Sequence, residues 1–247
     1  MEWDAPAIVL DVRPYGESDA VVTLMTEEHG AHRGLARGGQ SRTRTALWQP
    51  GNLVQARWLG RLADQLGSFS AELVHPAAAL VLDDRLALSM LTAACAVAEG
   101  AMPEREAHPR VFDGLLHLLA RLPQGKQRLA DQIRWELSLL ADLGYGLDLS
   151  RCAVTGAVGG LAFVSPRSGC AVSDAGAGLW KERLLALPAL LLGNAEGGSP
   201  ADWQAGLRLT GHFLARDAFG LQHKPLPSAR QALYDLVSSM AETDSNV

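Results

Sequence analysis

The feature that most constrains the fold is a change in hydrophobic period close to Pro76. Before it, short apolar and β-branched runs alternate with turn-forming residues, as is typical of strands. After it, apolar residues recur every three or four positions, as on the buried face of an amphipathic helix. Strands that precede helices in this way predict an α+β fold.

The first part of the chain is expected to form five short strands. The expected strands cover residues 7–12, 20–25, 32–36, 53–59 and 66–74. Five short strands favour a small closed barrel, and the OB-fold is the common five-stranded solution. A small SH3-like barrel is the alternative. We therefore assign residues 1–78 to an OB-fold domain that binds nucleic acid.

The remainder, residues 79–247, is predicted to be a helical domain. We expect Asp83 to cap a helix that Gly100 stops, and Leu129, Ile133, Leu137 and Leu140 to form the inward stripe of a helix over 127–143. The other expected helices are 111–122, one from Ser199-Pro200 to Gly220, and one that starts after Pro227-Ser228. Within 150–178 the helical pattern stops, and a β-hairpin around residues 166–169 is predicted as an insertion.

Composition is that of a soluble globular protein, with 48% apolar and 20% charged residues. Three cysteines are too few for a disulfide framework, and Glu2 and Asp4 stand where a secretory leader would be basic. The longest uncharged apolar run, 86–98, is shorter than the roughly 20 residues that cross a bilayer. We expect a reduced, cytoplasmic setting.

The candidate binding surface is a stretch, residues 29–63, that holds six arginines and no acid, although the net charge is −5 and the first 28 residues hold seven acids. Guanidinium groups match phosphate oxygens, and the glycines and hydroxyls of residues 38–45 suit a mobile loop. Trp48 and Trp58 are expected in the core, so binding should be nearly independent of base sequence. A solvated loop is the alternative. The predicted DNA-binding residues are Arg33, Arg37, Arg42, Arg44, Arg57 and Arg61.

The predicted hairpin has the spacing of a zinc ribbon without its full set of ligands. Cys152-Ala-Val-Thr155 and Cys170-Ala-Val-Ser173 each lack the second cysteine of a knuckle. Zinc needs four N, S or O ligands, and hydroxyls are poor ones. The sequence therefore predicts a ribbon-like hairpin with no metal and no cofactor.

Familiar catalytic patterns are missing from the sequence. It contains no phosphate-binding loop, no His-Glu-x-x-His and no Gly-x-Ser-x-Gly. This favours a binding protein over an enzyme. Two alternatives stay open: an adaptor whose arginines meet an acidic protein, and a metal-dependent nucleic-acid enzyme that uses other motifs.

Over nearly its whole length the chain resembles the bacterial RecO family of DNA repair and recombination mediators. Four segments in the family's order carry the resemblance: residues 7–19, then 36–42 leading to Leu47-Trp48-Gln49-Pro50, then Arg134-Trp135-Glu136-Leu137 followed by Leu143-Gly144-Tyr145-Gly146, and Lys224-Pro225-Leu226-Pro227-Ser228. The resemblance implies an OB-fold, a helical domain and an inserted zinc-finger-like hairpin. Many members carry two Cys-x-x-Cys pairs there, from which this chain departs at Thr155 and Ser173.

The same resemblance implies partners and a role. Members bind single- and double-stranded DNA, anneal complementary strands and, with RecR, help load RecA onto strands coated by single-strand-binding protein. This implies a cytoplasmic, nucleoid-associated protein. The helical domain of members also receives the acidic, hydrophobic C-terminal tail of single-strand-binding protein. By position, Arg134 is the candidate for the tail's carboxylate, with Arg128 and Lys126 as further candidates; a solvated Arg134 on the polar helix face is the alternative.

Overall fold

The computed structural model describes residues 1–62, 65–193 and 197–245. The chain divides into two compact units, Met1–Pro123 and Gln124–Val247. The first unit holds a barrel and the helices α1 to α3, and the second holds the remaining helices and a small sheet. The predicted domain boundary after residue 78 stays a prediction.

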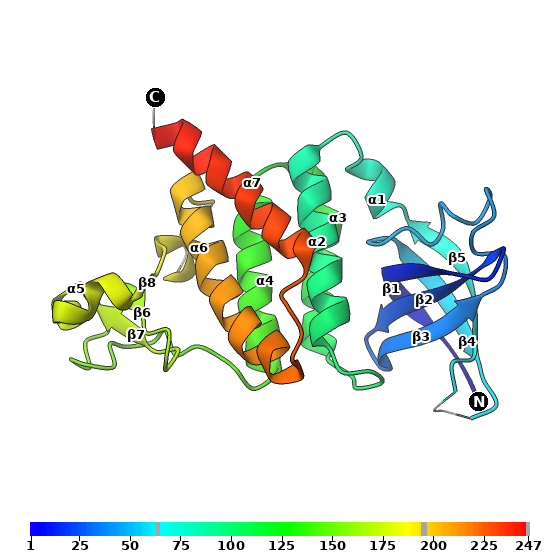
Figure 1. Ribbon diagram of the computed structural model, residues 1–247, viewed down its shortest axis with the longest axis horizontal. Coiled ribbons are helices and arrows are strands. Elements are labelled where there is room, and N and C mark those ends of the chain that lie inside the picture. The colour runs from blue at the N-terminus through cyan, green and yellow to red at the C-terminus, as the bar shows by residue number, and fades with distance from the viewer. Residues whose placement is uncertain (63–64, 194–196, 246–247) are drawn as a thin grey trace. The chain divides into compact units, whose positions relative to one another are not determined.

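Five strands close into a barrel in the first unit (Figure 1). They are β1 (Glu2–Tyr15), β2 (Asp19–Thr26), β3 (Gly30–Ala36), β4 (Leu53–Leu59) and β5 (Ser68–His75). The order around the barrel is β1-β2-β3-β5-β4, and only the β3–β5 pair is parallel. The predicted fold class and five-stranded barrel are confirmed.

Strand β1 is longer than predicted because it has two neighbours. Residues Glu2 to Ile8 pair with β4, whereas Ala7 to Tyr15 pair with β2, and a bulge lies between Val9 and Asp11. The prediction began the strand at residue 7, where the apolar and β-branched run begins.

The inward faces of the strands form a closed apolar core, and part of the barrel's outer face is also covered. Val9, Val22 and Trp58 belong to the inner cluster. Ile8 and Met25 point the other way and are nevertheless fully buried, because α2 packs on β1 and α3 packs on β2. Helices therefore occupy the outer side of β1 and β2.

The helices of the first unit are α1 (Ala77–Leu80), α2 (Arg85–Ala101) and α3 (Pro109–Arg121). Two predicted helix ends are wrong. Asp84, and not Asp83, caps α2, since its Oδ1 accepts from the N–H groups of Leu86 and Ala87 at 2.9 and 3.0 Å. Helix α2 continues past Gly100, because a glycine ends a helix only where it takes the left-handed conformation, which Gly100 does not.

In the second unit, three long helices are accompanied by a small sheet. The helices are α4 (Arg128–Asp142), α6 (Pro200–Phe213) and α7 (Ser228–Ser245), and the short α5 spans Asp174–Ala177. The predicted hairpin is formed by β6 (Leu161–Val164) and β7 (Ala171–Ser173), and β8 (Leu185–Ala186) adds a third strand beside β6. Among the described residues, no helix is long and apolar enough to cross a membrane.

A buried ion pair joins the three long helices of the second unit. Glu136 of α4 is 0% exposed and Arg230 of α7 is 1% exposed. Arg230 donates from Nε to Glu136 Oε1 (2.6 Å) and from Nη2 to Glu136 Oε2 (2.9 Å). Thr210 of α6 donates to the same carboxylate, and Arg230 Nη2 also reaches the Leu207 carbonyl oxygen at 2.8 Å.

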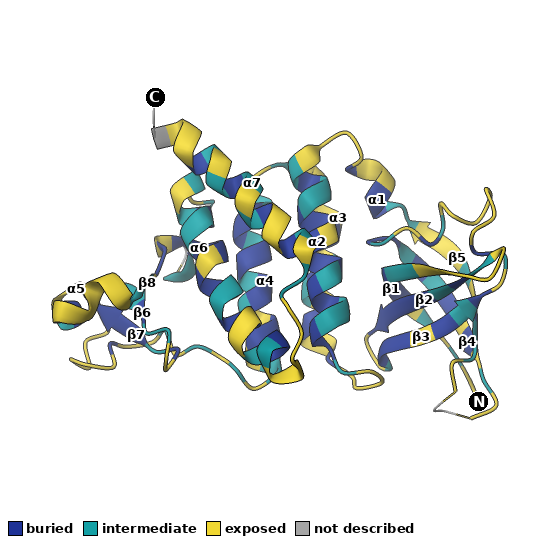
Figure 2. Cartoon of the chain, in the orientation of Figure 1, coloured by how far each residue is buried: buried dark blue, intermediate teal, exposed yellow. Residues whose placement is uncertain are grey.

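This pair corrects the predicted inward stripe of α4. Leu137 is only partly buried, whereas Glu136 and Gln132 are fully buried, as the dark stretches of α4 in Figure 2 reflect. Gln132 Nε2 donates to Glu136 Oε1 at 3.3 Å. A periodic pattern treats charged residues as outward, and it cannot show that a carboxylate has an arginine on another helix as its partner.

His32 of β3 lies inside the barrel, 5% exposed, with its ring edge-on to Trp58 at a centroid distance of 4.8 Å. Burial, together with the nearby charges of Arg105 and His29, lowers its pKa from 6.5 to about 4. Both ring nitrogens lack a hydrogen-bond partner in the described part of the chain. Folded His32 is therefore neutral at neutral pH.

We expect Arg230→Met to lower the free energy of unfolding by about 3–5 kcal/mol, because it leaves the Glu136 carboxylate buried without a counter-charge. The double variant Glu136→Leu/Arg230→Met should recover most of this loss. Urea denaturation followed by circular dichroism measures both. A double variant less stable than the single one would contradict the account.

We expect stability to fall as the pH drops from about 6.5 towards 4, since unfolded His32 binds a proton near 6.5 and the folded side chain only near 4. His32 makes its full contribution above that window, and this contribution is on the order of 3–4 kcal/mol, at about 1.4 kcal/mol per tenfold change in proton affinity. Denaturation across this range measures it, with His32→Gln as the comparison. Equal pH slopes for the two proteins would contradict the assignment.

Candidate nucleic-acid interface

The predicted arginines lie on β3, on β4 and in the loops that follow these strands. Arg33 is on the outer face of β3 and Arg57 on the outer face of β4, and β5 runs between the two strands. Arg37, Arg42 and Arg44 are exposed in the β3–β4 loop, and Arg61 is exposed after β4. The six therefore do not form a single row, and Ala63, the last residue of the acid-free stretch, lies outside the described residues.

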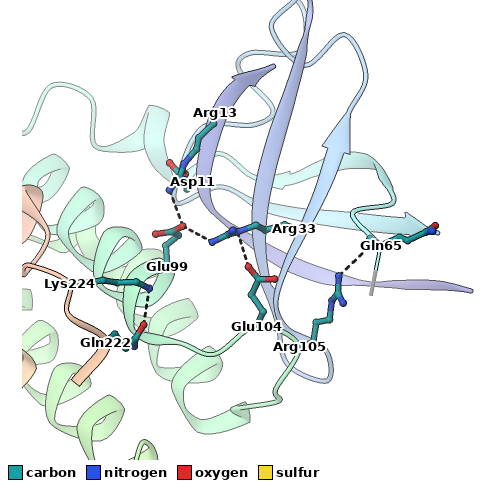
Figure 3. Close-up of polar contacts among 9 residues, drawn as sticks. All are labelled: Asp11, Arg13, Arg33, Gln65, Glu99, Glu104, Arg105, Gln222 and Lys224. Carbon is teal, nitrogen blue, oxygen red and sulfur yellow. Dashed lines mark hydrogen bonds and ion pairs between the residues drawn. The ribbon is translucent and has the colours of Figure 1, made fainter. Parts of the chain in front are cut away.

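Arg33 is paired with two carboxylates (Figure 3). Its Nε lies 3.0 Å from Glu104 Oε1 and its Nη2 lies 3.6 Å from Glu99 Oε1. Glu99 also accepts from Arg13 Nη2 at 3.1 Å. These pairs could not be predicted, because Glu99 belongs to α2 and Glu104 to the segment after it, both far from β3 in the sequence. Arg33 is already neutralised within the first unit.

Arg57 is also paired with an acid. Its Nη2 donates to Glu2 Oε1 at 2.9 Å, and Asp4 is its direct neighbour across the β1–β4 ladder. The hydrogen bond and the charge of Glu2 raise the pKa of Arg57 above its ordinary value. Both side chains are exposed, so the pair adds little stability, but a phosphate at this position would have to compete with Glu2.

The β3–β4 loop presents three arginines in a compact arrangement. Residues 37–48 fold into successive turns, and Gly38 N–H donates to Asp19 Oδ1 at 2.7 Å, which ties the loop to the β1–β2 turn. Arg44 Nη1 donates to the Arg37 carbonyl oxygen at 2.7 Å. No carboxylate pairs with Arg37, Arg42 or Arg44 among the residues that the structure describes. The predicted mobility of this loop stays a prediction.

Residues 29–63 contain no acid, but the fold places acids from other parts of the chain beside two of their arginines. Glu2, Glu99 and Glu104 come from distant parts of the chain and neutralise Arg33 and Arg57. Of the six predicted arginines, Arg37, Arg42, Arg44 and Arg61 have no carboxylate partner in the described ranges. DNA binding by these four stays a prediction.

The three residues predicted to bind the tail of a partner are Lys126, just before α4, Arg128, at its start, and Arg134, near its middle. Arg128 Nη1 and Arg134 Nη1 share the carboxylate of Asp131, at 2.8 and 3.5 Å. Arg134 Nη2 also donates to the Leu190 carbonyl oxygen at 3.0 Å, so Arg134 is fixed in place, while Lys126 is exposed. Tail binding by these residues stays a prediction.

The hairpin brings together a group of residues that differs from the predicted one. Ser173 Oγ donates to Cys152 Sγ at 3.3 Å, Thr155 N–H donates to the same sulfur at 3.4 Å, and Thr155 Oγ1 lies 3.5 Å from Ser173 Oγ. A Cβ added to Gly176 would lie 3.0 Å from Cys152 Sγ and 3.1 Å from Ser173 Oγ. The second knuckle is thus Ser173–Gly176.

The predicted pairing of Cys170 with Ser173 as the second knuckle is therefore wrong. Within the described residues, Cys170 Sγ contacts the Ser168 carbonyl oxygen at 3.7 Å instead. The error arose because Cys170-Ala-Val-Ser173 repeats the spacing of Cys152-Ala-Val-Thr155, and spacing was the only signal in the sequence. Gly176 has no side chain that could have drawn attention to it.

This donor set does not fit zinc. It offers one thiol, two hydroxyls and, at Gly176, no ligand atom, whereas a structural zinc site needs four good ligands. Hydrogen bonds from Ser173 and Thr155 lower the pKa of the Cys152 thiol to about 6, against the opposing effect of desolvation. These hydrogen bonds link Cys152, Thr155 and Ser173, which stand at positions where a zinc ribbon would have its ligands.

Two family models match the chain. The model of the recombination protein O N terminal matches residues 1–77, and that of the recombination protein O C terminal matches residues 82–227. The two matches cover the barrel and most of the chain after it.

Curated relatives match along nearly the whole chain. The DNA repair protein RecO of Granulibacter bethesdensis is 59% identical over 246 residues, which cover 99% of this chain and 98% of that protein. The DNA repair protein RecO of Gluconacetobacter diazotrophicus is 57% identical, with 97% and 96% covered. That of Acidiphilium cryptum is 55% identical, with 100% and 99% covered.

We expect the purified protein to hold far less than one zinc per chain, and a chelator to leave its thermal midpoint unchanged, because the hairpin has a single thiol at the knuckle positions. The variant Thr155→Cys/Ser173→Cys/Gly176→Cys should bind about one zinc and lose stability with the chelator. Metal analysis by mass spectrometry and thermal denaturation measure both.

Cys170→Ser in the background of that variant is the matched control. It should leave the zinc content unchanged, since Cys170 lies outside the group around Cys152. Stoichiometric zinc in the natural sequence would contradict the assignment of the hairpin.

Proposed function

Because the chain belongs to the recombination protein O family, we propose that it is a non-catalytic mediator of DNA repair and recombination that binds single- and double-stranded DNA and anneals complementary strands. With RecR, it helps to load RecA onto strands coated by single-strand-binding protein. The observation that supports DNA binding best is the β3–β4 loop, where an OB-type barrel carries Arg37, Arg42 and Arg44 without a carboxylate partner among the described residues. The protein acts in the cytoplasm, at the nucleoid.

Annealing needs no catalytic group. Two strands repel each other through their phosphates, and a protein that neutralises this charge lets complementary bases meet. Arginine suits this task because its planar donors grip phosphate oxygens and leave the bases free to pair. The loop is tied to the barrel by the hydrogen bond from Gly38 to Asp19, and the hydrogen bond from Arg44 to the Arg37 carbonyl oxygen keeps these two residues close together.

The start of α4 supports the proposed contact with single-strand-binding protein. Arg128 and Arg134 place two guanidinium groups beside the carboxylate of Asp131. Exposed Lys126 adds a third cation nearby in the sequence. An acidic peptide that ends in a carboxylate fits this charge.

We expect affinity for single-stranded DNA to fall with salt with a log–log slope of about −3 to −4, as contacts with four to six phosphates would give. The variant Arg37→Ala/Arg42→Ala/Arg44→Ala should flatten the slope by about 2, since each lost phosphate contact removes about 0.7. Fluorescence anisotropy with labelled oligonucleotides at several salt concentrations measures this.

The matched control is Arg33→Ala/Arg57→Ala, which removes two arginines that already have carboxylate partners. Its slope should stay close to that of the natural protein. A slope near zero in the natural protein would contradict DNA binding and favour an adaptor for an acidic protein. A larger effect of the control than of the loop variant would place the interface on the outer faces of β3 and β4.

A further inference from the structure

The barrel of the first unit has a cavity of about 370 Å³, and none of the six arginines predicted to bind DNA lines it. Its walls include Trp3, His29, His32, Trp58 and Arg105, which we call the aromatic cup. Small-molecule sites commonly occupy roughly 300–1,000 Å³ and are often found at the mouths of barrels. The cup is therefore large enough for a planar heteroaromatic ring.

Three rings of the cup form a column. Trp58 and Trp3 are near-parallel, at 15° with centroids 6.4 Å apart, and Trp3 and His29 are stacked at 22° and 4.8 Å. Trp58 is 2% exposed, whereas Trp3 and His29 are only partly buried. The column thus runs from the barrel core to a ring that is partly exposed.

Buried nitrogens without partners point to a ligand. The atoms Nδ1 and Nε2 of His32 and Nε1 of Trp3 are buried and make no hydrogen bond in the described residues. Such groups are rare in native proteins, because burying a polar atom without a hydrogen-bond partner is unfavourable. A neutral imidazole has one donor and one acceptor, so His32 can pair with the mixed donor and acceptor edge of a heteroaromatic ring.

Arg105 supplies a cation beside these rings. Its backbone has a φ of 62° and its N–H donates to the Ala31 carbonyl oxygen at 2.8 Å, which fixes the residue against β3. The side chain donates from Nη2 to the Gln65 carbonyl oxygen at 3.2 Å (Figure 3), and other guanidinium donors remain for an anion.

The charges around the cup distinguish between occupants. Glu2 and Glu28 also line it, and Glu2 is paired with Arg57. An acidic peptide would be repelled by Glu28, whereas a nucleotide places a neutral base among the rings and its phosphate beside Arg105. The chemistry therefore favours a nucleobase.

We propose that the aromatic cup receives one unstacked nucleobase of single-stranded DNA, which stacks on His29 at the end of the ring column while Arg105 meets a neighbouring phosphate. This inference rests on the proposed DNA binding and adds a contact with a base to it. Any base has a π-face, so stacking tolerates every sequence. Stacking of one base in the cup distinguishes single strands, whose bases are free, from duplexes, whose bases are already stacked and paired.

The test compares an oligo(dT) with an abasic oligonucleotide of the same length and phosphate number. The natural protein should bind oligo(dT) about tenfold more tightly, as expected for one stacked base. His29→Ala should reduce this ratio, whereas Arg105→Ala should weaken binding to both oligonucleotides alike, because both carry the phosphate. The exposed residues His117 and Arg110 of α3, changed to alanine, should leave the ratio and both affinities unchanged.

Three outcomes of this comparison would each contradict a proposal. A ratio near one, with the normal salt dependence on both oligonucleotides, overturns the cup proposal and leaves phosphate binding intact. Binding to neither oligonucleotide overturns the proposed function and the cup proposal together. A tenfold ratio that persists in a folded His29→Ala protein, or an Arg105→Ala protein that binds both oligonucleotides as tightly as the natural protein, overturns the assignment to the cup.

Discussion

The buried pair of Glu136 and Arg230 is the interaction on which the helical unit depends. Neither charge is tolerable alone in an apolar interior, so the three helices that supply the pair and its hydrogen bonds have to assemble together. A purely apolar interface between these helices would permit small rotations and slips. Two charges that must meet in bidentate geometry permit one arrangement, and this accounts for the fixed register of α4, α6 and α7.

The pair also gives a physical reason for two of the segments by which the family was recognised. Glu136 lies within Arg134-Trp135-Glu136-Leu137, and Arg230 follows shortly after Lys224-Pro225-Leu226-Pro227-Ser228. In the sequence these segments are far apart, and nothing in either one identifies the other as its partner. The structure joins them through one salt bridge.

The sequence predicted the barrel well and the candidate site less well, for one common reason. Side-chain alternation is local, so β4 was predicted with its observed ends, 53–59. The neutralisation of Arg33 by Glu99 and Glu104 depends on residues that only the fold brings near. The knuckle at Gly176 was missed because glycine has no side chain that could suggest a ligand. The aromatic cup was missed because its rings come from four separate places: β1, the β2–β3 turn, β3 and β4.

The double pairing of β1 also has a consequence for the order of folding. Its second half can pair with β2 as soon as a short turn forms, whereas its first half needs β4, which ends at Leu59. Closing so long a loop carries a larger entropic cost than forming a hairpin. The β1–β2 hairpin should therefore form early. The barrel should close late, when the first half of β1 pairs with β4, which is synthesised later.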